Sequence, residues 1–118
     1  METLITYCFH VPGTLVANLT PLFAVPFDCT LLHVSAVASN NSDATLKVGT
    51  PANPAAYLAE FPIGDSQTPA VKASFKDFVG GQYPRLNAGN SLLITLDYDG
   101  NNGTAAQNVS VALTLAKG

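Results

Sequence analysis

Two cysteines and two histidines are the residues whose types and spacing could do chemistry, because thiolates and imidazoles bind zinc and also act as nucleophiles and bases. Cys8 and His10 are two residues apart, and Cys29 and His33 are four apart. Side chains at these spacings share a face of a β-strand, so two adjacent strands in register would gather four zinc ligands. The spacing matches no zinc motif, however, and we favour buried thiols and hydrogen-bonded histidines. A disulfide between Cys8 and Cys29 is an alternative that a reducing cytosol disfavours.

The other catalytic or cation-binding patterns are weak. The segment 97–101 begins like a calcium loop, but its glycine comes fourth, and Asn102 and Asn108 stand where an EF-hand needs glycine and glutamate. A hairpin turn explains these residues better. An acyl-transfer site lacks a Gly-x-Ser-x-Gly elbow, and carboxylates scattered over expected loops do not define a glycosidase pair. We therefore expect no enzyme, no metal and no cofactor.

A group of aromatic residues in the irregular middle third of the chain, beside an arginine, is a candidate contact or binding loop. Jelly-roll lectins bind sugars on exposed aromatic rings, which is the functional interpretation. We favour the alternative that these residues close an end of the barrel or a subunit contact, because tryptophan, the best stacking residue, is absent. The candidates are Tyr57, Phe61, Phe75, Phe78, Tyr83 and Arg85.

The composition indicates what kind of surface carries these residues. The 118 residues are 47% hydrophobic and only 11% charged, against about 25% charged in average soluble proteins. The five basic and eight acidic residues are scattered singly and give a net charge of −3, so no basic patch predicts nucleic-acid binding. No apolar run has the length of a membrane span, so we expect no membrane partner. We expect a surface rich in Ser, Thr, Asn and Gln, part of it buried against copies or partners.

The length and the N-terminus set two further expectations. A chain of 118 residues predicts a single domain over 1–118. Residues 1–6 form neither the basic nor the apolar region of a signal peptide, so we expect synthesis in the cytosol.

Alternation of apolar and polar residues predicts short β-strands separated by turns. Pro12 and Gly13 end the first strand, and Pro21 makes the second an edge strand or one split in two. The segment 29–38 is mostly apolar on both alternate faces, which predicts a central strand. The predicted strands are 3–11, 15–25, 29–38, 44–49, 92–98 and 109–116, with at most one short strand between 50 and 69.

The turn residues complete the predicted architecture. Ser74 and Asp77 have the spacing of a capping box, which predicts one short helical turn near 74–79, ended by two glycines. The segment 99–103 favours positive φ and predicts a hairpin between the last two strands. About seven or eight short antiparallel strands at this spacing predict an all-β, single-domain jelly roll or β-sandwich.

Over residues 28 to 116 the chain resembles small proteins found among the structural genes of tailed bacteriophages. The likeness consists of strand and turn patterns, not a catalytic signature. It is carried by 31–40 (LLHVSAVASN), 43–50 (DATLKVGT), 64–66 (GDS), 77–84 (DFVGGQYP), 97–100 (DYDG) and 103–109 (GTAAQNV).

The resemblance implies a jelly-roll capsid decoration, or cement, protein. Such a protein lies on the outside of an icosahedral head, often as a trimer, and bridges neighbouring major capsid subunits. It therefore implies a virion location, with further copies of the chain and the major capsid protein as partners. The alternative is a head-fibre or tail module that binds host-surface carbohydrate through the loop aromatics. Residues 1–11 lie outside the resemblance and are either a first strand or an arm that grips the capsid.

Overall fold

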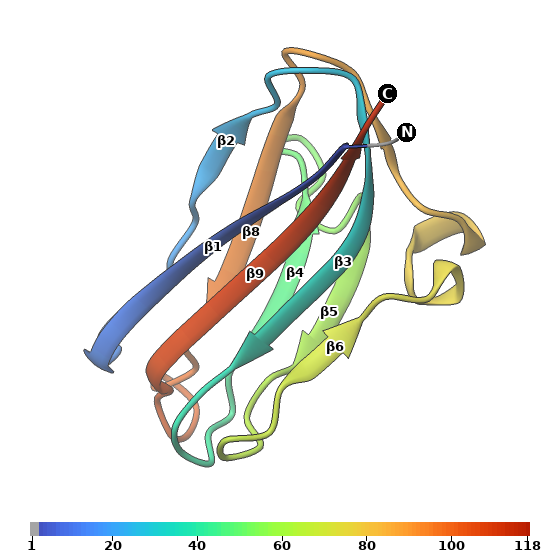
Figure 1. Cartoon of the computed structure of the whole chain (residues 1–118). Helices are drawn as coiled ribbons and strands as arrows, with labels where there is room; N and C mark the ends of the chain where they lie inside the picture. The colour runs from blue at the N-terminus through green and yellow to red at the C-terminus, as the bar shows by residue number, and fades with distance from the viewer. Residues whose placement is uncertain (1–2) are drawn as a thin grey trace.

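The computed structural model describes residues 3–118 as two antiparallel sheets packed face to face (Figure 1). Sheet A contains, in order, β1 (Thr3–Thr14), β9 (Gln107–Lys117), β3 (Cys29–Val37) and β6 (Ala70–Lys72), with the two-residue β7 (Arg85–Leu86) also paired to β3. Sheet B contains β2 (Leu22–Ala24), β8 (Ser91–Asp97), β4 (Thr45–Gly49) and β5 (Leu58–Pro62). Within residues 3–118, no helix is long and apolar enough to span a membrane.

The strand pairing is that of a jelly roll. Four antiparallel pairs are nested in the sequence, each enclosing the next, as in one long folded-back ribbon. From the innermost outward they are β4·β5, β3·β6, β2·β8 and β1·β9. Rolling this ribbon brings β3 against β9 and β4 against β8, which closes the two sheets. The predicted all-β jelly-roll sandwich is therefore confirmed, and the very short β6 and β7 raise the number of strands above the predicted seven or eight.

The core lies between the sheets and follows the period of two. Leu92, Ile94 and Leu96 of β8 are buried, whereas the residues between them are half-buried on the outer face of sheet B. The central position predicted for β3 is confirmed, and its alternation is interrupted at one point. A bulge between Leu31 and His33 places Leu31 on the buried face.

The predicted hairpin between the last two strands is wrong. β8 pairs with β2 and β4 in sheet B, whereas β9 pairs with β1 and β3 in sheet A. The loop between them crosses the end of the sandwich, and it turns where the Asp97 carboxylate accepts the Asp99 N–H at 3.0 Å and Asp99 has a φ of 45°. Turn residues permit the reversal, but they do not decide which sheet the next strand joins.

The first two strands also depart from their predicted bounds. β1 continues through Pro12 and Gly13 to Thr14, with a shift in its pairing to β9 after Val11. β2 keeps only three residues, and an isolated bridge joins Leu19 to Leu96 before Pro21. The predicted split at Pro21 is therefore present, and β2 is an edge strand.

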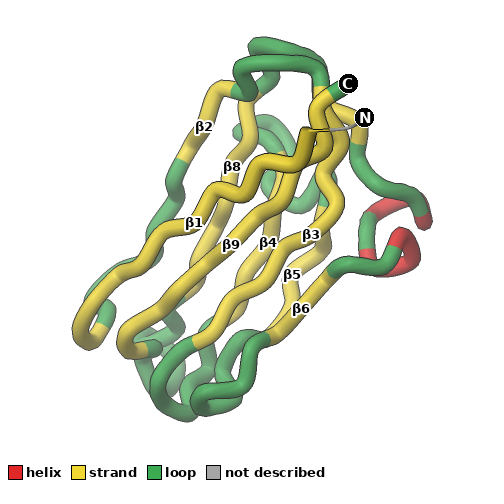
Figure 2. The backbone as a smooth tube through the Cα atoms, in the orientation of Figure 1, coloured by secondary structure: helices red, strands yellow, loops and turns green. Residues whose placement is uncertain are grey.

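The predicted helical turn near 74–79 is present as two short 3₁₀ turns, η1 (Phe75–Asp77) and η2 (Val79–Gly81). The Ser74 N–H donates to the Asp77 carboxylate at 3.2 Å, as the capping pattern predicts. Gly80 has a φ of 84°, which lets the chain reverse. The two turns form a loop that projects from the β5–β6 side of the sandwich (Figure 2).

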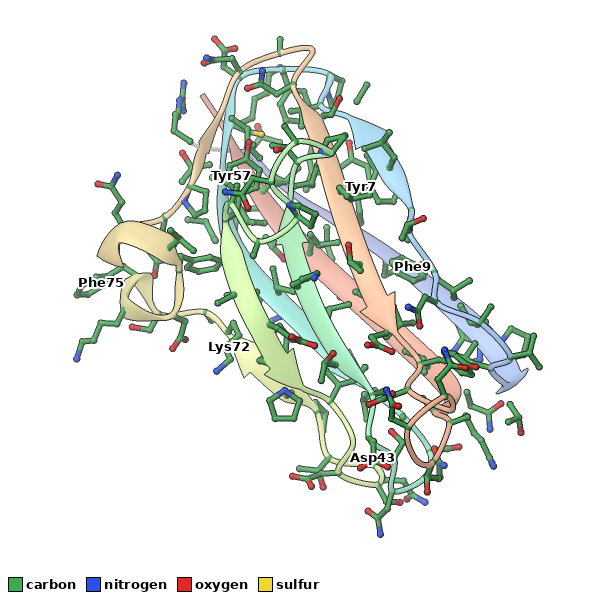
Figure 3. The ribbon with its side chains drawn as sticks, turned by 180° about the vertical axis from the view of Figure 1, so that it is seen from behind. Tyr7, Phe9, Asp43, Tyr57, Lys72 and Phe75 are labelled. Carbon is green, nitrogen blue, oxygen red and sulfur yellow. The ribbon has the colours of Figure 1, made fainter. Side chains whose placement is uncertain are left out.

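Loops from both sheets are hydrogen-bonded to one another at the end of the sandwich where Asp43 lies (Figure 3). The Asp43 carboxylate accepts the Thr104 N–H at 2.8 Å, and the Asp43 N–H donates to the Thr104 carbonyl at 3.0 Å. The Ser66 N–H donates to the Asn41 side-chain oxygen at 3.0 Å. Asp43, Ser66 and Thr104, which lie in the segments that carry the resemblance, therefore hold these loops together.

Candidate functional site

The six candidate contact residues surround one edge and the adjoining loop of the sandwich. Two of the six are exposed, two are half-buried and two are buried. Tyr57 precedes β5, Phe61 lies in β5, Phe75 lies in η1, Phe78 links η1 to η2, Tyr83 follows η2, and Arg85 lies in β7.

Phe78 anchors the projecting loop to the core. Its side chain is 3% exposed, and its ring centroid lies 5.7 Å from that of Tyr83 at an interplanar angle of 56°. The Tyr83 hydroxyl donates to the Ala73 carbonyl at 2.9 Å, and the Val79 N–H donates to the Tyr57 carbonyl at 3.0 Å. Burial also raises the pKa of the Tyr57 hydroxyl. The structure thus brings three of the six candidates together as a packed support for the loop.

Phe61 is buried on the inner side of β5, with 5% of its surface exposed. The Lys72 ammonium of β6 lies 5.4 Å from the centroid of its ring. A cation at this distance over an aromatic ring is attracted by its π electrons. Phe61 therefore joins the core to the charged surface of the β5–β6 edge.

Phe75 and Arg85 are the two candidates whose side chains are exposed. Phe75 is 49% exposed and lies on the outer side of the η1–η2 loop (Figure 3). The Arg85 guanidinium donates to the Gly118 carbonyl and, at 3.4 Å, to the Thr30 hydroxyl. A single exposed ring offers one stacking surface, while Arg85 is held by β3 and by the C-terminal residue Gly118.

The cysteines and histidines do not gather into one site. Cys29 faces the core and Cys8 faces outward on sheet A, and both thiols are free. Burial raises the pKa of the Cys29 thiol, which keeps it protonated near neutral pH. Within residues 3–118, no three His, Cys, Asp or Glu residues lie close enough to hold a metal ion.

His10 and Ser110 form a hydrogen-bonded pair on the outer face of sheet A. The His10 Nδ1 lies 2.7 Å from the Ser110 hydroxyl, and both residues are on paired strands. Acyl transfer needs, besides such a pair, an acid that orients the imidazole and donors for an oxyanion. Within residues 3–118, no carboxylate is hydrogen-bonded to this pair.

A second aromatic surface lies at the opposite edge, where β1 of sheet A and β2 of sheet B run beside each other (Figure 1). Two hollows of about 450 and 260 Å³ open there, and both are lined by Phe23. The Tyr7 ring stacks on the Phe23 ring, with the two ring centroids 6.2 Å apart. We call this surface the β1–β2 groove and define it by Tyr7, Phe9, Val11, Leu19, Pro21 and Phe23.

Sequence reasoning did not select the β1–β2 groove, although two signals mark it. One is the apolar odd-numbered face of β1, which pairs with the buried face of β9 yet stays partly exposed because β1 is an edge strand. The other is the stretch from Thr3 to Phe27, which contains no Asp, Glu, Lys or Arg. Figure 3 places Tyr7 and Phe9 at this edge, across the molecule from Phe75.

Comparison with known proteins relates the fold to a virus particle. No protein-family model matches the chain, and no curated protein matches it. Among solved structures, one chain of the capsid asymmetric unit of cyanophage Pam1 superposes with a TM-score of 0.58. The match covers 99% of this chain and 85% of that chain at 19% sequence identity. The protein thus has the fold of a chain from a phage capsid.

Proposed function

We propose that the protein is a structural virion protein that decorates the outside of a phage capsid as a homotrimer and bridges neighbouring major capsid subunits. The observation that carries the proposal is the fold match to a chain of a cyanophage capsid. This match covers 99% of the present chain. The strand and turn segments that resemble tailed-phage structural proteins support the same function.

The chemistry of the surface also supports a structural function. A decoration protein needs extended contact surfaces, and an 11% charged chain with an uncharged edge offers them. Of the aromatic candidates, Phe61 and Phe78 are buried and Phe75 alone is exposed, so the group offers little stacking surface for a sugar. These features favour a protein that acts by binding.

Decoration would stabilise the shell by mass action. A protein that binds assembled heads and not free subunits lowers the free energy of the assembled state alone. At a free concentration one hundred times its Kd, the gain is about 2.7 kcal/mol for each occupied site. Many sites on one shell would then resist disruption together.

A binding experiment on heads tests the proposal. Heads of the phage that encodes the chain, produced without this protein, are mixed with the purified chain and sedimented, with unassembled major capsid protein as the control. We expect saturable binding to heads, no binding to free subunits, and a higher temperature of head disruption. Binding to host cells or their surface glycans with none to heads would instead support the alternative, a head-fibre or tail module that binds carbohydrate.

A further inference from the structure

We propose that the β1–β2 groove is the surface through which copies of this chain associate, each groove lying beside a common three-fold axis. This inference rests on the trimer of the proposed function and assigns the surface that forms it. The occupant of each groove is the β1 or β2 side of a neighbouring copy. Shape, charge, the strand edges and symmetry each support this assignment.

The groove is an apolar hollow that no part of the described chain fills. Phe9, Val11 and Phe23 are packed against the core on one side but stay partly exposed on the other. The larger hollow, about 450 Å³, is lined almost wholly by apolar groups of the edge. Apolar surface of this kind is stabilised when it is removed from water, by about 25 cal/mol for each Å² buried.

The distribution of charge indicates a second copy as the occupant. No residue that lines either hollow is charged, and every charged residue after Glu2 lies between Asp28 and Lys117. Two copies of a chain with a net charge of −3 repel each other through their other surfaces, but not through this one. The uncharged β1 side of one copy can therefore lie against the uncharged β2 side of another without repulsion between like charges.

The strand edges at the groove lead to the same occupant. β1 has twelve residues and pairs on one side only, so its outer edge keeps free N–H and C=O groups. Edge strands are usually protected by charged side chains or by being very short. In β1 only Pro12 and the pairing shift after Val11 interrupt the edge, so the stretch from Thr3 to Val11 has neither device, and contact with another copy would cover it.

The position of the two strands fits three-fold symmetry. β1 belongs to sheet A and β2 to sheet B, and both lie at the same edge of the sandwich. Rotation about an axis beside this edge places the β1 side of one copy against the β2 side of the next. Such a contact joins two different surfaces, and a three-fold rotation closes it into a ring.

Charge placed in the groove tests the assignment. The variants are Tyr7→Asp, in a side chain that is 36% exposed, and Thr20→Glu, at an exposed position on the rim of the larger hollow. The matched control is Phe75→Asp at the opposite edge, where the ring is 49% exposed. Light scattering gives the mass of each, and circular dichroism with thermal unfolding verifies its fold. One chain weighs 12.3 kDa.

We expect a trimer for the unmodified chain and for Phe75→Asp, and monomers for Tyr7→Asp and Thr20→Glu. If Tyr7→Asp does not fold, Thr20→Glu decides the result, because it removes no packed ring. A trimer that persists in the folded groove variants would overturn the surface assignment and leave the trimer standing. Dissociation by Phe75→Asp alone would overturn it as well. A monomeric unmodified chain would overturn both, while head binding is tested separately by sedimentation.

Discussion

The two long edges of the sandwich differ in how they meet solvent. The β5–β6 edge carries Glu60 and Lys72, and both of its strands are short, β5 with five residues and β6 with three. The β1–β2 edge has the longest strand of the described chain and no charged residue between Thr3 and Phe27. Short strands, prolines and charges keep an edge from pairing with other chains. The β1–β2 edge also contains Pro12 and a β2 of three residues, so what distinguishes it is the length of β1 and the absence of charged side chains.

Aromatic residues are arranged differently at these edges. At the β5–β6 edge, Phe61 and Phe78 are buried and support the sheet and the projecting loop, whereas Phe75 on that loop is exposed by itself. At the β1–β2 edge, Tyr7 and Phe23 stack on each other while remaining partly exposed. Exposed apolar surface of appreciable size marks interaction sites more often than buried rings do.

The largest effect is expected where the charged edge depends on a buried ring. Phe78→Ala should lower the free energy of unfolding by about 3–5 kcal/mol, because it leaves a cavity under the η1–η2 loop. Phe75→Ala, at the exposed position nearby, should change it by less than about 0.5 kcal/mol. Urea denaturation measures both. Equal losses would mean that the loop is not anchored through Phe78.

A smaller effect is expected at the open edge. Phe23→Ala should lower the free energy of unfolding by about 2 kcal/mol, between the costs for a buried and an exposed ring, because it loses core contact and the stack on Tyr7. Phe23→Leu, which keeps most of the apolar volume, should cost less than about 1.5 kcal/mol. Measuring both in the Thr20→Glu background separates folding from association. A loss as large as that of Phe78→Ala would remove the distinction between the edges.

The cation over Phe61 should contribute less still. Lys72→Met keeps the aliphatic length but removes the charge, and it should lower stability by about 0.5–1 kcal/mol. Lys72→Arg keeps the charge near the ring and serves as the control. Thermal unfolding compares the two variants. Equal stability of all three proteins would show that the side chain contributes only its apolar stem.

The smallest effect is expected from salt on association. A contact made by uncharged groups is little affected by screening, so the association constant should change by less than about threefold between about 0.05 and 0.5 M NaCl. Sulfate should strengthen the contact, because it favours burial of apolar surface. Sedimentation equilibrium gives the constants. A fall of about tenfold or more in NaCl would place ion pairs in the interface and contradict the uncharged groove.

Turn chemistry was the part of the fold that local sequence predicted in most detail. The 3₁₀ turn begins at Ser74 and is held by Asp77, because an Asp three residues after Ser can accept the free N–H at the start of a turn. The break at Pro21 also follows from one residue, since proline lacks the N–H that a strand pair requires. Both signals act within a few residues, so they do not depend on the rest of the chain.

The candidate site was harder to predict than the fold. Residue types alone do not distinguish whether the aromatic group from Tyr57 to Tyr83 is a binding surface or a packed support. Burial distinguishes the two, and burial depends on which sheet covers each ring. The β1–β2 groove is formed by strands of different sheets that meet only after the ribbon is rolled.

By itself, the sequence determined that the chain forms short strands, that apolar residues alternate along β8 and β9, and where most turns fall. It also determined that the first quarter of the chain is nearly free of charge. Only the tertiary structure decided that β8 and β9 belong to different sheets, that Leu31 is buried by a bulge, and that β1 and β2 share one open edge. The physical reason is that alternation and turn propensity are local, whereas strand pairing joins residues far apart in the chain. Those pairings are selected by how the two faces bury each other.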